Sequence, residues 1–553
     1  MDDLREKIFK LALRNSLIHD GKANSGSVLG SLISLDPEVK KRIKEIKPVV
    51  DEIVSEVNKM SLDEQKMKAE EMGVSLKVES KEEKDLPPLP DAEPGKVVMR
   101  LAPYPSGPLH IGNARTFIIN DEYVKRYGGK LLLVIDDTIG SEKKAVIKDA
   151  YDLIVDGLRW LGVDFDPNII YKSDRLEIYY KYAEELIKTG KAYVRECSAE
   201  EMRKNRADGV ECVHRNQSIE ENLEKWKRML DPNGYKEGEA VVRLKTDMKH
   251  PNPAFRDRVL LRISEREHPR VGRKYRVWPL LEFSWAVDDH LLGITHILRG
   301  KDLMMESKME KYIWDIFGWK PAKFLYTGLA KIEGVKISKS KAQKEVLSGE
   351  YSGWDDPRIW SLQSLRRRGI KPEAIRAFSI HLGMSLSDVT VPIDKLYSEN
   401  RKIIDPISNR YFFVSDPVEI VLDKKMNDAE APLHPDYPDR GKRIIPVGEK
   451  IYIDRKDFEK FKGKEVRLLH LCNIILDKKS KVTSLDVKDI PKIHWVSEKK
   501  LKVKVVMPDA SEVDGFAEPD FEKVEVDDSI QFERFGFCRV DSKNPWVCYF
   551  THR

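Results

Sequence analysis

Cysteine is scarce in this sequence. The 553 residues include only five cysteines, an odd number without the regular spacing of a disulfide framework. We therefore expect a chain that works in a reducing compartment. The five positions are Cys197, Cys212, Cys472, Cys538 and Cys548.

Long apolar runs and a strong charge bias are also missing. No stretch reaches the roughly 18 consecutive apolar residues that cross a bilayer. The opening MDDLREKIFKLALRNS mixes both signs of charge, which excludes a secretory signal, so we expect a cytoplasmic protein without a membrane span. Lysine and arginine number 98 against 93 acidic residues, a balance that permits nucleic-acid binding without requiring it.

Patterns along the chain predict several domains, as its length requires. Short apolar runs alternate with amphipathic stretches in a way typical of a parallel α/β sheet, and an irregular region interrupts this alternation. Strand-like runs separated by Gly, Pro and Asp predict barrels near the C-terminus. The expected order is a helical N-terminal domain at 1–78, a linker at 79–95, the first half of a Rossmann-type domain at 96–195, an insertion at 196–274, the second half at 275–345, a helical connecting subdomain at 346–395 and an all-β barrel region at 396–553.

One motif joins an early strand to a helix. The segment VVMRLAPYPSGPLHIGNAR, 97–115, runs through a loop rich in Pro and Gly and enters a helix near Gly112. A helix start offers unpaired N–H groups and a positive dipole end, and His110 adds a donor, so phosphate can bind there. A histidine that only caps a helix would show the same H-I-G, so this motif does not decide the function.

A second motif follows a later strand. The segment EGVKISKSK, 333–341, carries Lys336, Lys339 and Lys341 with two hydroxyls. Lysines near a polyphosphate can neutralise the charge that develops on leaving pyrophosphate. Taken alone, the segment is more typical of a solvated basic loop.

Together, in this order and in these loops, the two motifs resemble the HIGH and KMSKS signatures of class I aminoacyl-tRNA synthetases. Within that class the chain is similar to the glutamyl and glutaminyl branch from about residue 96 to its end. Its β-rich C-terminal third resembles the archaeal and eukaryotic type, and so does HDGKANSGSVLG at 19–30. The segments that carry the resemblance are RLAPYPSGPLHIGNAR from Arg100, DDT at 136–138, VDDHLLGITHILRGKD at 287–302, KISKS at 336–340, EVRL at 465–468, HWV at 494–496 and ERFGF at 533–537.

The resemblance implies a glutamate–tRNA ligase that uses ATP with Mg²⁺ and tRNA(Glu). The Rossmann-type domain is then catalytic, the insertion contacts the acceptor stem, and the barrels bind the anticodon. Positioning and charge stabilisation supply the rate in such a reaction. His110, Lys336 and Lys339 are the catalytic residues that the motifs imply. The implied ATP-binding set is Pro103, Pro105, Ser106, Gly107, His110, Gly112, Asn113, Ser338 and Lys339.

Glutamate carries two carboxylates and one ammonium, so its pocket needs two cations and one anion. Arg100 and Arg299 stand at strand ends and can each pair a carboxylate, and Asp136 after another strand can receive the ammonium. Open α/β sheets bind ligands at these ends, although a structural ion pair is the alternative for each residue.

The chain departs from the family pattern at several places. Val134, Ile139 and Gly140 replace residues of a common R-F-D/E-D-T-D-P segment. Leu281 stands where a tyrosine is usual, with Trp285 four residues on, and Asn113 replaces the last histidine of HIGH. The lining of the amino-acid pocket is therefore expected to be unusual.

Zinc is not expected. Cys197, Cys212 and His214 have plausible ligand spacing, and relatives can carry an additional cysteine where this chain has Arg195. Three ligands leave a closed structural zinc site incomplete.

Two other functions remain possible at this point: a glutaminyl-tRNA synthetase, and a tRNA-binding paralogue without catalysis. Basic residues of the barrel region, Lys442, Arg443 and Arg467, are candidates for phosphate contacts, though each one taken singly is more typical of a solvated surface residue. The sequence leaves open whether tRNA(Gln) is also charged and what the oligomeric state is.

Overall fold

The fold is taken from a computed structural model. It describes residues 2–18, 21–35, 39, 42–74, 86–140, 145–334 and 339–553. The chain divides into two compact units, Met1–Asp85 and Leu86–Arg553. In the described ranges, no helix combines the length and apolar character needed to cross a bilayer.

The smaller unit is helical, as predicted. Apolar residues at helical spacing, among them Ile8 and Val50, form its core. Ser61 and Glu64 form the predicted capping box, in which the Glu64 N–H donates to Ser61 Oγ and the Ser61 N–H donates to the Glu64 carboxylate. Its helices are α1 (Asp2–Ile18), α2 (Ser25–Leu35), α3 (Ile43–Val57) and α4 (Leu62–Glu71).

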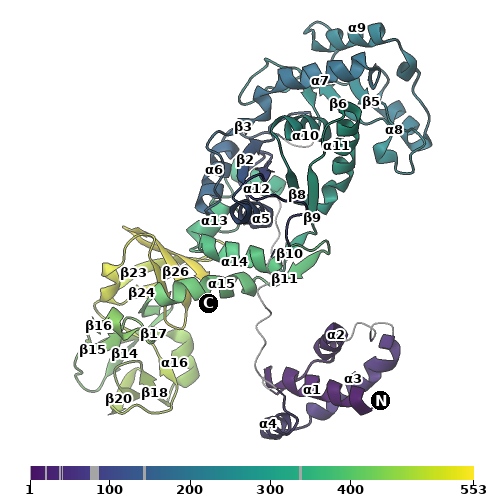
Figure 1. The fold of residues 1–553 in the computed structure, drawn as a ribbon. Coiled ribbons are helices and arrows are strands. Elements are labelled where there is room, and N and C mark those ends of the chain that lie inside the picture. The colour runs from purple at the N-terminus through teal and green to yellow at the C-terminus, as the bar shows by residue number, and fades with distance from the viewer. Residues whose placement is uncertain are drawn as a thin grey trace. The chain divides into compact units, whose positions relative to one another are not determined.

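A parallel α/β core forms the centre of the larger unit and confirms the predicted Rossmann-type fold (Figure 1). Arg100 of the first strand pairs with Leu132 of the second. Thr295 lies beside the first strand and donates its N–H to the Val98 carbonyl, which brings the later strands alongside. The core elements are β1 (Val98–Leu101), α5 (Ile111–Tyr127), β2 (Lys130–Ile135), α6 (Ala150–Trp160), β3 (Ile170–Tyr171), α10 (Leu281–Leu291), β8 (His296–Gly300), α11 (Met304–Phe317) and β9 (Lys323–Thr327).

The insertion between these halves has its own antiparallel sheet, in the order β4-β5-β6-β7. Helices α7 and α9 pack near this sheet around Trp226, and the group lies at one end of the α/β core in Figure 1. The elements are α7 (Leu176–Lys188), β4 (Ala192–Arg195), α8 (Ala199–Asp208), α9 (Ile219–Leu230), β5 (Val241–Leu244), β6 (Val259–Ile263) and β7 (Val277–Pro279).

Leu86 and Leu89 anchor residues 86–95 to the α/β domain, which corrects the prediction that all of 79–95 is an extended linker without packed structure. Leu86 and Leu89 are buried in the core of the α/β domain. The Tyr123 hydroxyl donates to the Pro87 carbonyl at 2.7 Å. Proline and charge content did predict an irregular backbone, but two leucines were enough to anchor it.

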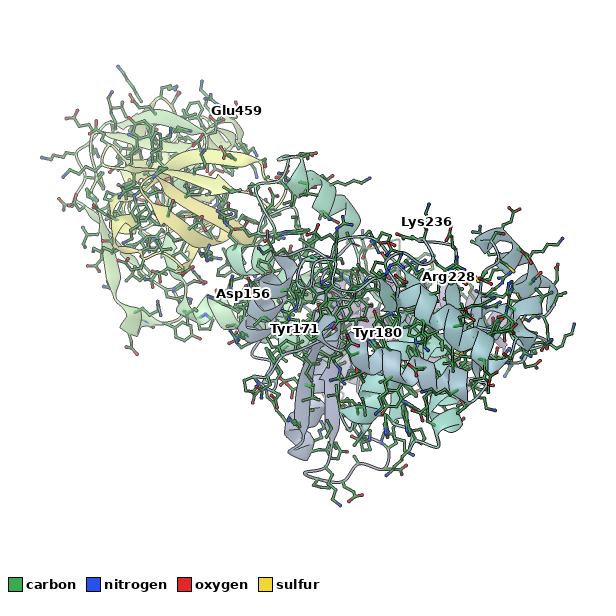
Figure 2. All side chains as sticks on the ribbon, turned by 90° about the horizontal axis from the view of Figure 1, so that it is seen from above. Asp156, Tyr171, Tyr180, Arg228, Lys236 and Glu459 are labelled. Atoms are coloured by element: carbon green, nitrogen blue, oxygen red, sulfur yellow. The ribbon has the colours of Figure 1, made fainter. Side chains whose placement is uncertain are left out.

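Helix α13 links the α/β core to the C-terminal region. Its Gln363 and Arg366 donate to Asp156 of α6 at 2.9 and 3.0 Å. Asp156 is labelled in Figure 2. Arg367 of α13 pairs with Asp541 of the C-terminal β region at 3.1 Å. The connecting elements are β10 (Ala330–Ile332), α12 (Lys339–Leu347), α13 (Leu362–Arg367), α14 (Pro372–Leu382), β11 (Val389–Val391) and α15 (Asp394–Ile404).

The C-terminal region is all-β apart from the short helix α16 (Arg455–Phe461), and its two barrel-like sheets confirm the prediction. One sheet has seven strands in the order β12 (Asn409–Tyr411), β25 (Ser529–Phe532), β26 (Gly536–Lys543), β27 (Trp546–His552), β23 (Leu501–Val506), β24 (Glu512–Ala517) and β13 (Phe413–Val414). The other has seven in the order β21 (Lys492–Ile493), β18 (Glu465–Leu468), β19 (Asn473–Ile475), β20 (Lys479–Ser484), β14 (Pro417–Leu422), β17 (Lys450–Asp454) and β22 (Val496–Ser497). β15 (Ala429–Pro432) and β16 (Lys442–Ile445) form a separate hairpin.

Candidate active site

A cavity of about 900 Å³ opens where β1, β2 and β8 end and α5 begins. Arg100, Asp136 and Arg299 line it from the strand ends. His110 and Gly112 line it from the start of α5. The cavity thus lies where open α/β sheets bind their ligands.

The loop before α5 has a shape that requires glycine. Gly107 has a φ of +144°, and a Cβ added there would lie 3.2 Å from the Trp354 ring. The helix then begins after His110, whose N–H donates to Asn113 Oδ1 at 3.4 Å. Asn113 therefore helps to hold the helix start, which the motif's usual histidine would not do in the same way.

The start of α5 is also held by the connecting helices. The Ile111 N–H donates to the Trp360 carbonyl at 3.2 Å, and the Leu362 N–H donates to the Leu109 carbonyl at 2.9 Å. One turn further, the buried Arg115 donates to the carbonyls of Gly328 and Gly383. These contacts fix the direction in which the helix points at the cavity.

Most residues predicted for ATP are near this helix start. Pro103, Ser106, His110, Gly112 and Asn113 line the cavity. Pro105 and Gly107 shape the loop without being part of that lining. Lys336 and Ser338 lie outside the described residues. Lys339 begins α12, whose Gln343 lines the cavity.

Each predicted glutamate-binding arginine has a buried carboxylate partner. Arg100 donates to Asp289 through Nε at 2.6 Å and Nη2 at 2.8 Å. Arg299 donates to Glu310 through Nη1 at 2.7 Å and Nη2 at 3.1 Å. These bidentate pairs hold both guanidinium planes rigidly at the cavity wall.

Asp136 is equally well held. Its Oδ2 accepts the indole N–H of Trp285 at 2.9 Å, and its Oδ1 accepts from Thr138 at 3.2 Å. Lys172 Nζ lies 3.5 Å from Oδ1 and donates to Ser284 Oγ at 2.9 Å. The structure thus brings Arg100, Asp136 and Arg299 to one wall, around Trp285.

Burial disfavours charge at two of these groups. Burial raises the pKa of Glu310 to about 7, although the Arg299 guanidinium opposes the shift. Burial likewise lowers the pKa of the Lys172 ammonium, against the attraction of Asp136. Each of the three cations in this wall, Arg100, Arg299 and Lys172, thus has a carboxylate beside it.

Several residues of this wall were missed from the sequence. Asp289 lies in the VDDH segment at 287–290, where two adjacent aspartates were the sequence signal that could have pointed to it. Lys172 and Glu310 had none, because nothing local shows that they are buried. Arg206 and Arg258 of the insertion also line the cavity, and Arg258 pairs with Glu282 and Glu306.

The departures from the family pattern have structural reasons. Val134 and Ile139 are buried in the second hydrophobic core of the α/β domain. A Cβ at Gly140 would lie 2.8 Å from the Pro279 carbonyl, so glycine allows the close approach of β7. Leu281 and Trp285 both line the cavity.

Cys197, Cys212 and His214 come together in the insertion. The two Sγ atoms are 3.7 Å apart, and His214 Nδ1 lies 3.3 and 3.2 Å from them. The fully buried Arg195 guanidinium stands beside Cys197 and lies 3.9 Å from Glu201. A cation at this position does not fit a fourth zinc ligand, so the group lacks the donor set of a closed site.

Two of the three candidates for phosphate contacts in the β region are buried, so they are neither phosphate contacts nor solvated surface residues. Arg443 is buried and pairs with Glu518 and Glu533. Arg467 is buried and donates to Asn473. Lys442 remains exposed and pairs with Glu430.

Another cavity, of about 870 Å³, lies in the C-terminal region. Its lining includes the cations Arg401 of α15, Lys456 of α16 and Arg534, and the aromatic Phe535 and Phe550. Three aspartates also line it, Asp394, Asp454 and Asp457, and Arg534 pairs with Asp457. Cations beside aromatic faces are the chemistry that recognises unstacked bases and phosphates.

Three family models match the chain. Residues 96–406 match the catalytic domain of the class I tRNA synthetases (E and Q). Residues 408–490 and 492–541 match two anticodon-binding domain models of the same group.

Curated relatives are similar along the whole chain. The glutamate–tRNA ligase of Methanocaldococcus jannaschii is 46% identical, with 100% of both chains covered. That of Pyrococcus furiosus is 47% identical, again with 100% of both covered. That of Pyrococcus abyssi is 47% identical over 96% of each chain.

Proposed function

Since the chain belongs to the class I tRNA synthetases of the E and Q group, we propose that it ligates glutamate to tRNA(Glu) through a glutamyl-adenylate. AMP and pyrophosphate are released. ATP with Mg²⁺, L-glutamate and tRNA(Glu) are the substrates and partners. The cytoplasm is the proposed compartment, which suits five cysteines without a disulfide among them.

The reaction has two steps. A glutamate α-carboxylate oxygen bonds to the α-phosphorus of ATP while the bond to the bridging oxygen of pyrophosphate breaks. A terminal ribose hydroxyl of tRNA then bonds to the glutamyl carbonyl carbon, and AMP leaves. Neither step needs a covalent bond to the protein, so the residues act by position and charge.

One observation carries this proposal. Arg100, Arg299 and Asp136 converge on one wall of a cavity whose other end is a helix N-terminus. Two cations and one anion suit the two carboxylates and the ammonium of glutamate. The helix start suits phosphate. The amino acid and ATP would thus meet inside one cavity.

We assign the ATP end to the predicted residues around α5 and α12. His110 and the Gly112 N–H would hold phosphate oxygens, and Asn113 keeps the helix start in place. Lys336 and Lys339 would neutralise the leaving pyrophosphate. Helix α12 begins at Lys339, and Gln343 of that helix lines the cavity, which supports the role of Lys339. Mg²⁺ would arrive with ATP and keep most of its ligands from phosphate and water.

The tRNA would contact both ends of the larger unit. Arg206 and Arg258 bring the insertion to the mouth of the cavity, which suits delivery of the acceptor end. The cavity around Arg401 and Phe535 offers a cation and an aromatic face, which suit bases of the anticodon loop. In this proposal Cys197, Cys212 and His214 of the insertion bind no zinc.

A charging assay tests the proposed function. Purified protein is incubated with ATP and tRNA(Glu) or tRNA(Gln), and attachment of labelled glutamate and glutamine is compared. Glutamate attached to tRNA(Glu) is the expected result. Attachment of glutamine alone would identify a glutaminyl-tRNA synthetase, and tRNA binding without charging would identify a paralogue without catalysis.

A further inference from the structure

Trp285 has an unusual set of neighbours. The centroid of its indole ring lies 3.8 Å from the Arg100 guanidinium carbon and 4.5 Å from that of Arg299. Lys172 Nζ lies 4.9 Å from the same ring. Three buried cations thus contact one aromatic side chain, and this side chain is itself only 6% exposed. Cation–π attraction is strongest at such desolvated positions.

The polar edge of the ring has a partner as well. The indole N–H donates to Asp136 Oδ2 at 2.9 Å. All three groups proposed for glutamate, namely Arg100, Arg299 and Asp136, therefore contact this one side chain. Each arginine is also paired with a carboxylate, Asp289 or Glu310. The ring and these carboxylates together fix where the arginines stand.

The ring also stands where the family pattern is broken. Leu281 and Trp285 are four residues apart in α10, so they lie one above the other on the same helix face, and both line the cavity. The pattern has an aromatic residue at 281. Here the aromatic residue is one turn along the helix, at the level of the arginines.

We propose that Trp285 is the positioning residue that makes this subsite selective for an acidic amino acid. The inference rests on the proposed function. The ring contacts the guanidinium groups of Arg100 and Arg299, and all three side chains line the cavity. Its N–H orients Asp136 for an ammonium. Glutamate then meets a preorganised wall, whereas the amide of glutamine brings only one carboxylate to the two guanidinium groups.

Glutamate affinity and selectivity should therefore depend on the ring in a graded way. Trp285→Phe keeps a ring face but removes the N–H, and should raise the KM for glutamate about threefold to tenfold. Trp285→Ala removes both, and should raise that KM by about thirtyfold or more while the glutamate preference over glutamine falls about tenfold. The KM for ATP should stay within about twofold, because the helix start does not contact the ring.

The test measures KM and kcat for glutamate, glutamine and ATP in tRNA charging by wild type, Trp285→Phe and Trp285→Ala. Trp226→Phe is the matched control, since Trp226 is buried in the insertion core and does not line the cavity. Leu281→Tyr with Trp285→Ala restores an aromatic residue one turn back and should recover about tenfold of the lost KM.

Three results would overturn the inference: an unchanged glutamate KM in either Trp285 variant, an ATP KM that rises in parallel, or a double variant no better than Trp285→Ala. If Trp285→Ala does not fold, Trp285→Phe decides the matter alone. Wild-type protein that charges no glutamate would refute the proposed function and the inference together. Active wild type with indifferent Trp285 variants would refute the inference only.

Discussion

The guanidinium of Arg299 and the carboxylate of Glu310 form a bidentate pair in which both side chains are at most 3% exposed. Arg299 comes from the end of β8 and Glu310 from α11, the next helix. The pair therefore joins a strand end at the cavity to the helix that follows it. Because the pair is buried, altering either partner should change the free energy of unfolding.

Removing one member of this pair should destabilise the protein more than removing both. Arg299→Met leaves a buried carboxylate without its cation, and breaking a buried pair in this way costs about 3–5 kcal/mol. Arg299→Met with Glu310→Leu replaces the pair by apolar groups and should regain most of that loss. Thermal midpoints from calorimetry, compared as a double-mutant cycle, check this. Simple additivity of the single losses would contradict the prediction.

His110→Ala should slow adenylate formation by about 10²-fold, the effect of removing one donor to developing charge. His110 stands at the start of α5, where its side chain and the helix end face the cavity. ATP–pyrophosphate exchange with tRNA present measures the step. His250→Ala, outside the cavity lining, is the control and should exchange at the wild-type rate.

Lys339→Ala should also reduce adenylate formation by about 10²-fold, because a cation at the leaving pyrophosphate would be lost. Its affinity for tRNA should be nearly unchanged in filter binding. Lys344→Ala changes an exposed lysine of the same helix and serves as the control. A Lys339 variant with the wild-type exchange rate would remove this residue from the mechanism.

The wild-type protein should purify with well below one zinc per chain, since Arg195 stands beside the Cys197–Cys212–His214 group. Arg195→Cys would supply a fourth ligand, and should bind about one zinc per chain and raise the thermal midpoint. Elemental analysis and calorimetry measure both effects. A full zinc equivalent in the wild type would show that three ligands suffice.

Acid should weaken the C-terminal β region through His552. Burial lowers the pKa of His552 from 6.5 to about 4. Asn400 Nδ2 lies 3.1 Å from its Nε2, in position to donate to the neutral ring. The folded state thus takes up its proton only at lower pH than the unfolded chain does. The stabilisation, up to about 3 kcal/mol, is present above about pH 6.5 and is lost as the pH falls through about 4.

His552→Gln keeps a side chain that can face Asn400 but does not titrate. Its thermal midpoint should fall less than that of the wild type between pH 6.5 and pH 4. His250→Gln changes the number of histidines by the same amount at a surface turn. Parallel pH profiles for His552→Gln and the wild type would show that another group governs the acid loss.

Local patterns predicted the elements and the strand-end residues. Alternation of apolar runs and amphipathic stretches predicted the parallel sheet, and Ser61 with Glu64 predicted a helix start, because both signals lie within a few residues of what they determine. Arg100, Asp136 and Arg299 could be grouped because strand ends of a parallel sheet meet at one edge.

Contacts between distant parts of the chain could not be predicted in this way. The Arg100–Asp289 pair spans 189 positions, and only the fold decides that the carboxylate arrives there. Arg443 looked like a surface cation, but it is buried against Glu518. Leu86 and Leu89 were assigned to a linker because prolines and charged residues surround them in the sequence. Nothing local shows that both leucines are buried in the core of the α/β domain.

Helix α13 connects the start of α5 to the C-terminal β region. The chain entering it is bonded to both sides of His110, through Trp360 to Ile111 and through Leu362 to Leu109. Its end is bonded to β26 through Arg367 and Asp541. A catalytic fragment cut before β12 would lose the bond between α13 and β26. The catalytic part and the C-terminal β region are therefore poor candidates for separation. Exchange between relatives should keep α13 and β26 from the same protein.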